Sequence, residues 1–190
     1  MKDKIIELLR STGRDGIENL INYMSETDFF TAPCSTQHHL CKVGGLAEHS
    51  LNVYKLMWDI FHQSHYMCSS SELNFANIII VSLLHDLGKS TYKGRSTYEP
   101  NYLASGKISD KKPYEVNKTS YFTHELKSIL IAKQFIELTD DEEFVIYYHN
   151  GLYEVSGREI QGKERPLQQL LHFADMWCSR FIETKEATTA

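Results

Sequence analysis

The sequence predicts an all-α fold, a helical bundle interrupted by one small β-hairpin excursion. Apolar residues recur at helical spacing in six separate segments. One long stretch, residues 89–122, has no helical period. At 190 residues and 42% hydrophobic content, the chain has the size of one domain with a single core. We therefore expect residues 1–190 to form one domain whose core lies within about 29–183.

The expected helices follow one another with short connections. In order they cover 2–24, with a break at 13–16, then 45–61, 72–87, 123–136, 140–149 and 166–183. The serines at 69–71 are expected to cap the helix that begins at Glu72. Pro166 suits a first helical turn, where its missing N–H has no partner to lose. The stretches before Gly45 and after Asn150 are rich in turn formers and are expected to be loops.

Residues 89–122 are the excursion, and a β-hairpin is expected across YLASGKISDKKPYEV within it. From Gly88 to Phe122 the chain carries seven basic residues against three acidic ones, and six aromatic residues. Tyrosines that stack on bases beside lysines that meet phosphates would suit a single-stranded nucleic acid. A hairpin that only shields the core would use the same residues, so both interpretations stay open.

Composition and charge exclude some classes of protein. A net charge of −5 argues against a surface that grips nucleic acid everywhere. The apolar runs are too short to span a bilayer and the N-terminus has no signal-peptide layout, so we expect a cytoplasmic protein with no membrane partner. The four cysteines form no CxxC pair and are expected to be reduced thiols.

The helix at 72–87 raises a problem of charge. Its residues are mostly apolar, which is typical of an element buried on most sides, yet it ends in His85 and Asp86. A buried carboxylate needs a compensating charge. Four other polar residues also fall on apolar helix faces by their spacing: His49, His124, His149 and Asp175.

Two explanations fit these inward-facing residues. Each could be a core polar group bonded to its own backbone partner, the ordinary state of a single buried histidine. One metal centre would satisfy all of them together, since imidazoles and carboxylates on facing helices are the usual ligands in bundle cores. Mixed nitrogen and oxygen ligands suit one or two divalent ions of Mn, Fe, Co, Ni or Zn, with Mg less favoured.

The motifs GGLAEHS, HDLGK and LLHFAD, in this order, resemble the HD-domain superfamily of metal-dependent phosphohydrolases, whose pattern is H…HD…D. The match covers about Phe29 to Phe181, and its approach to the first histidine resembles the subset that includes bacterial 3′-to-5′ exoribonucleases. The resemblance implies that His49, His85, Asp86 and Asp175 hold a first metal. His124 in FTHE and His149 in YYHNG match the two extra histidines of members with a second metal, which Asp86 would bridge. The GYP extension of the cyclic di-GMP enzymes is absent, which disfavours that activity.

The expected function is a metal-dependent phosphohydrolase that cleaves a phosphoester of a nucleotide or short nucleic acid by metal-activated water. Asp86 and Lys89 are the expected catalytic residues. Lys89, His38, His39 and Arg180 are the expected substrate contacts. The alternative is a non-catalytic HD module that senses or scaffolds a metal or nucleotide, and a di-iron oxygenase is a third reading. The oligomeric state stays open.

Three further sets of residues can each be interpreted in two ways. The segment CSTQHHLC could in principle form a closed zinc site through Cys34, His38, His39 and Cys41, although four ligands within eight residues would be cramped. His172 is either a group that orients a ligand or a packed histidine. Lys89 and Arg165 are either substrate contacts or ordinary surface cations.

Overall fold

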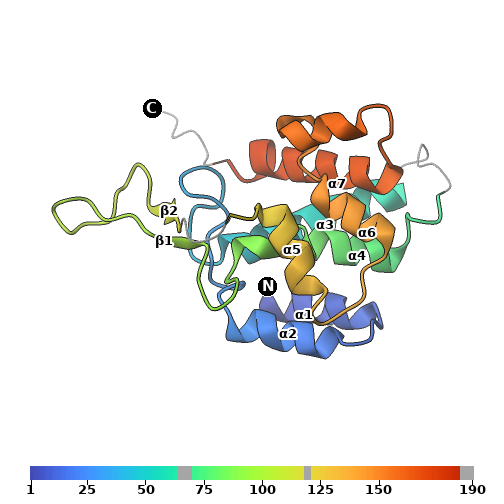
Figure 1. The fold of residues 1–190 in the computed structure, drawn as a ribbon, viewed down its shortest axis with the longest axis horizontal. Coiled ribbons are helices and arrows are strands. Elements are labelled where there is room, and N and C mark those ends of the chain that lie inside the picture. The colour runs from blue at the N-terminus through green and yellow to red at the C-terminus, as the bar shows by residue number, and fades with distance from the viewer. Residues whose placement is uncertain (64–69, 118–120, 185–190) are drawn as a thin grey trace.

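The computed structural model describes residues 1–63, 70–117 and 121–184, and it confirms a mostly helical fold with a small two-stranded antiparallel hairpin (Figure 1). The elements in chain order are α1 (Lys2–Ser11), α2 (Ile17–Glu26), α3 (Gly45–Gln63), α4 (Phe75–Leu84), η1 (Leu87–Lys89), β1 (Tyr98–Pro100), β2 (Tyr114–Val116), α5 (His124–Ala132), α6 (Asp140–Tyr147), η2 (Gly151–Tyr153), η3 (Val155–Ile160), α7 (Pro166–Trp177) and η4 (Cys178–Ile182). The break predicted at 13–16 separates α1 from α2.

Helix α4 lies at the centre of the bundle. Every residue from Asn77 to Leu84 is buried, and α4 contacts α1, α3, α6 and α7 (Figure 1). A helix that is apolar on all sides must pack on all sides, which explains this position. Because His85 and Asp86 follow α4 directly, the same burial carries them into the middle of the helical bundle.

The turn after α4 packs closely against α5. A Cβ atom on Gly88 would lie 2.1 Å from the backbone oxygen of His124 and 2.8 Å from the backbone nitrogen of Ser128. The hydroxyl of Ser128 also accepts from the N–H of Gly88 and donates to the carbonyl of His85. Glycine is therefore the residue that lets η1 approach α5, and this approach brings His124 to Asp86.

Helix starts agree with the prediction in one place and differ in another. Pro166 opens α7, as expected. The predicted serine cap of the central helix is wrong: α4 starts at Phe75, and the side chain of Asn74 accepts from the N–H of Asn77. Asparagine caps as well as serine, and the hydroxyl of Ser70 is used by Glu72 instead. Ser69 lies outside the described residues.

The hairpin starts earlier than predicted. Tyr98 pairs with Val116 and Pro100 with Tyr114, so the first strand precedes the segment YLASGKISDKKPYEV. That segment contains the second strand, β2, and an isolated bridge between Tyr102 and Ile108. The hairpin extends outward from the helices (Figure 1).

The C-terminal part departs from the prediction twice. The loop expected after Asn150 contains the two short 3₁₀ helices η2 and η3, and α7 ends at Trp177, where the chain continues as a π-helix, η4. A π-turn widens the helix and shifts the direction of the residues that follow. Across the described residues, no helix is both long and apolar enough to cross a bilayer.

Candidate metal centre

Six polar side chains from five helical segments meet in the interior of the bundle. They are the six positions predicted as metal ligands: His49 in α3, His85 and Asp86 after α4, His124 at the start of α5, His149 after α6, and Asp175 in α7. Four of them are buried, and only His124 and Asp175 are partly exposed. No short segment of sequence contains the cluster, which exists because α3, α6 and α7 pack on α4 while α5 packs on the turn that follows α4.

One half of the cluster surrounds His49. Its Nε2 atom lies 3.2 Å from Oδ1 of Asp175 and 3.3 Å from Nε2 of His85. Oδ2 of Asp86 is 3.7 Å from Nε2 of His49 and 3.6 Å from Nε2 of His85. Atoms bound about 2.1 Å from one ion lie about 3.0–3.4 Å apart from each other, so these spacings are close to those of ligands that share an ion.

The other half faces the second oxygen of the same carboxylate. Oδ1 of Asp86 lies 3.3 Å from Nε2 of His124 and 3.7 Å from Nε2 of His149. Neither Oδ1 of Asp86 nor Nε2 of His124 has a hydrogen-bond partner among the described residues, although both atoms are buried. Buried polar atoms without partners are rare and costly, so an ion between them is a physically reasonable partner.

The opposite ring nitrogens show which way the histidines present their lone pairs. Nδ1 of His49 lies 2.9 Å from Oε2 of Glu183, Nδ1 of His85 lies 2.9 Å from the carbonyl of Ser82, and Nδ1 of His149 lies 2.8 Å from the carbonyl of Ile146. Each partner is an acceptor, so each Nδ1 carries the proton and donates.

A neutral histidine with a proton on Nδ1 has a lone pair on Nε2. With such a proton, Nε2 of His85 and of His149 turns a lone pair toward the carboxylate of Asp86, and Nε2 of His49 does the same whenever that ring is neutral. Acceptors that face acceptors repel unless a proton or a cation lies between them. These buried His and Asp residues could thus hold a metal ion.

Burial sets the protonation of most of the cluster. Burial lowers the pKa of His85 to about 4 and, together with the charge of Lys89, lowers the pKa of His124 to about 3. For Asp86, burial alone raises the pKa, but Lys89 and the surrounding histidines hold the pKa well below its usual range. The ionised carboxylate and neutral imidazoles that result are the forms that bind metals.

His49 differs from the other histidines. Burial, its largest single influence, lowers its pKa, but Cys34 and the hydrogen bonds to Asp175 and Glu183 raise the pKa well above the usual value. When no cation is bound, Nε2 of His49 carries a proton and donates it in a hydrogen bond to the carboxylate of Asp175. An ion at this position would take the place of that proton.

Lys89 is more deeply placed than a surface lysine. Its Nζ atom lies 2.6 Å from Oδ2 of Asp86, and its side chain is 17% exposed. Burial alone lowers the pKa of Lys89, but the charge of Asp86 raises it well above its usual value. The reading of Lys89 as an ordinary solvated lysine is therefore wrong, since it supplies part of the compensating charge that Asp86 requires.

Two glutamates that the sequence analysis missed support the histidines. Glu183 is buried, and it accepts from His49 and from the side-chain amide of Asn52 at 3.0 Å. Its backbone N–H bonds to the carbonyl of Cys178 at 2.9 Å, the five-residue spacing of the π-turn. Ordinary helical periodicity does not find it because the π-turn changes its direction. Glu125 lies 3.4 Å from Nδ1 of His124, and its position next to that histidine was the available signal.

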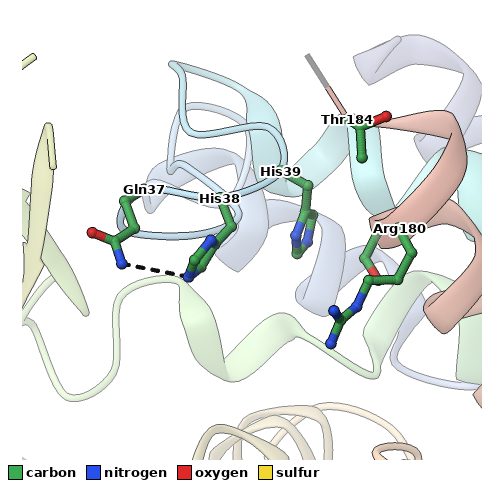
Figure 2. Close-up of a pocket in the computed structure, with 6 residues that line it drawn as sticks. Gln37, His38, His39, Arg180 and Thr184 are labelled. Carbon is green, nitrogen blue, oxygen red and sulfur yellow. Dashed lines mark hydrogen bonds between the residues drawn. The ribbon is translucent and has the colours of Figure 1, made fainter. Parts of the chain in front are cut away.

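A cavity of about 570 Å³ opens beside His49. It is lined by Gln37, His38, His39, Ser179, Arg180 and Thr184 (Figure 2). The ring centroid of His39 is 5.2 Å from that of His49, so His39 joins the cavity to the cluster. The guanidinium of Arg180 lies 5.7 Å from the ring centroid of Tyr153. The cavity thus brings His38, His39 and Arg180, three of the expected substrate contacts, to one place.

Other candidates of the sequence analysis have different surroundings. Sγ of Cys34 lies 3.3 Å from Nε2 of His39, and the two group with His49. Burial raises the pKa of Cys34 to about 11, so it is a thiol. Nδ1 of His172 donates to the carbonyl of His149 at 2.8 Å, and Arg165 forms ion pairs with Glu72 and Asp141. Arg165 therefore has structural partners rather than a place at the cluster.

No protein-family model matches this chain, and neither a curated protein nor a solved structure matches it. The class of protein is consequently defined by fold and side chains alone. The chain is a helical protein with a small β-hairpin and a buried cluster of His and Asp residues that could bind metal. This arrangement is compatible with an HD domain.

Proposed function

We propose that this chain is an HD-type, metal-dependent phosphohydrolase that cleaves a phosphoester of a nucleotide or a short nucleic acid. The observation that carries the proposal is the orientation of the histidines. Nε2 atoms of four histidines lie 3.3–3.7 Å from the two oxygens of Asp86, while three of the same rings donate from Nδ1 to acceptors behind them. A purely structural cluster has no need for such aligned lone pairs.

The residues have separable tasks in this proposal. A divalent ion at such a site lowers the pKa of bound water and withdraws charge from a phosphoryl oxygen. Asp86 would serve both halves of the cluster, since each of its oxygens faces a different set of imidazoles. Glu183 and the backbone carbonyls keep the rings in the ligating tautomer and orientation.

Substrate would be held from two sides. The ammonium of Lys89 lies at the carboxylate of Asp86 and could shift to a phosphate oxygen when the carboxylate is neutralised. Arg180 and His38, both exposed in the adjoining cavity, offer donors to a phosphate or a base (Figure 2). His39 lines the same cavity, and its ring centroid is 5.2 Å from that of His49 in the cluster. This cavity is where we expect the part of the substrate that extends beyond the scissile bond.

The test is a hydrolysis screen with protein reconstituted separately with manganese, iron, cobalt or nickel. Nucleotides, dinucleotides and short RNA and DNA are the substrates, and Asp86→Ala and Asp59→Asn are the paired variants. Asp59 is an exposed residue of α3, outside the cluster. We expect turnover by wild type and Asp59→Asn and none by Asp86→Ala.

Two results count against the proposal. Equal activity of wild type and Asp86→Ala would assign the turnover to a contaminant. Tight metal binding without turnover on any substrate would favour the non-catalytic module instead, since such a module keeps the ligands and lacks the reaction.

A further inference from the structure

A second cavity lies between the base of the hairpin excursion and α5. It measures about 440 Å³, and its lining includes Tyr92, Lys93, Arg95, Thr97, Tyr121 and Lys127. Three of these side chains are cations. The described residues that line it include no carboxylate. Its lining residues are also different from those of the cavity beside His49.

Lys127 is the unusual member of this lining. It is 6% exposed, and its ammonium donates to the hydroxyl of Thr97 at 3.1 Å. That hydroxyl is itself directed to the carbonyls of Gly88 and Ser90. An ammonium has three donors and rarely lies nine-tenths buried without a paired charge. Among the residues that the structure describes, Lys127 forms no ion pair.

The other two cations belong to a tight turn. Tyr92 and Arg95 form an antiparallel bridge, and the two residues between them, Lys93 and Gly94, have φ angles of 50° and 74°. Two consecutive positive φ angles are typical of the primed hairpin turns. Lys93 lies 5.4 Å from the ring centroid of Tyr92, and Arg95 is exposed and forms no ion pair with a described carboxylate. The turn thus holds two cations at the mouth of the cavity.

We propose that this second cavity binds the phosphate group of a nucleotide, with the base against an exposed tyrosine. These three cations form no ion pair with a described carboxylate, although the charge of Glu125 acts on the buried Lys127, and together they offer donors to a phosphate. The fully exposed Tyr121 offers a ring face on which a base can stack, and Tyr92, partly buried against the core, lines the same cavity. The ligand is either a mononucleotide or one nucleotide of a single strand. This site does not depend on a metal or on hydrolysis.

The experiment measures binding of a fluorescently labelled single-stranded oligonucleotide by anisotropy, at low salt and with EDTA present so that no metal takes part. The variants are Arg95→Ala and Lys127→Met, the second of which keeps the length of the buried stem. Lys133→Ala is the matched control, because Lys133 ends the same helix and pairs with Glu143 away from the cavity.

We expect each cavity variant to weaken binding roughly tenfold, the usual cost of one charged contact. The slope of log K against log salt should fall by about 0.7 for each cation removed. Lys133→Ala should change neither quantity. Because Arg95 is exposed, its variant carries the test even where Lys127→Met reduces stability.

Competition separates the possible ligands. A nucleoside monophosphate should compete better than inorganic phosphate, which would support both the phosphate contacts and the base contact. A free nucleoside should compete poorly. Equal competition by inorganic phosphate and nucleotide would overturn the role of the tyrosines. Equal weakening by Lys133→Ala and Arg95→Ala, or no binding at low salt, would overturn the site itself. None of these results bears on the hydrolase proposal, which is tested with metal present.

Discussion

Replacement of Asp86 by asparagine is the sharpest test of the buried cluster. The carboxylate lies within 3.7 Å of four imidazole Nε2 atoms and forms an ion pair with Lys89. Asparagine keeps the shape of the side chain but removes its charge and replaces one acceptor oxygen with an NH₂ donor. One half of the cluster therefore loses a ligand, whichever way the amide turns.

The magnitude follows from linkage between binding and folding. Metal at a hundred times Kd adds about 2.7 kcal/mol to the stability of a folded protein that alone binds it. In a chain of this size each kcal/mol raises Tm by about 2–4 °C, so wild type should melt roughly 5–11 °C higher with metal than without. A lost ligand should weaken binding by at least about a hundredfold, since an outer-shell partner alone can account for that much. The shift in Asp86→Asn then falls to about 1–2 °C at the same metal concentration.

The assay is thermal unfolding followed by circular dichroism, with each variant measured against itself in EDTA and in manganese or nickel. Because the Tm with metal is compared with the Tm in EDTA for the same variant, the stability lost with the Lys89–Asp86 ion pair cancels. Asp59→Asn is the charge-matched control and should keep the wild-type shift. A full shift in Asp86→Asn, or an equal loss in Asp59→Asn, would show that metal binds elsewhere and would refute the reasoning.

Three further outcomes follow from particular contacts. Glu183→Gln should weaken metal binding about 10–100-fold by calorimetry while the fold is kept, because His49 loses a charged acceptor behind its ring; unchanged affinity would contradict that role. Arg14→Met should lower the free energy of unfolding in urea by about 3 kcal/mol, because it leaves the fully buried Glu142 without its cation. Arg10→Met, at an exposed pair, should have little effect. The free energy of unfolding of metal-free protein should decrease as the pH falls from 6.5 toward 4. The pKa values of His85 and His124 are lowered in the folded protein, so the unfolded chain binds more protons in that range. A free energy of unfolding that stays constant over this range would argue against neutral buried rings.

Local patterns predicted most of the helical framework. Apolar spacing placed α3, α5, α6 and α7 near their observed starts, and the Gly13–Gly16 break separated α1 from α2. The errors lie at boundaries where two local signals compete. Asn74 rather than a serine caps α4, and the first strand begins at Tyr98 because pairing with β2 is a long-range choice.

The cluster was predictable for a related reason. A histidine on the apolar stripe of a helix must point inward, so the spacing around His49 and the position of His85 after a fully apolar helix were sufficient to select them. Glu183 carries no such signal, because its direction depends on a π-turn that periodicity does not indicate. Lys127 was overlooked because a lysine in a helix is ordinarily exposed.

The sequence by itself determined which segments become helices and which polar side chains those helices turn inward, because both depend on residues a few positions apart. Only the tertiary structure decided what these side chains meet. The two oxygens of Asp86 face different sets of histidines, Lys89 is drawn to the same carboxylate, and Lys127 lies buried beside Thr97. Such contacts join residues from separate elements, and packing around α4 rather than any local rule sets their distances.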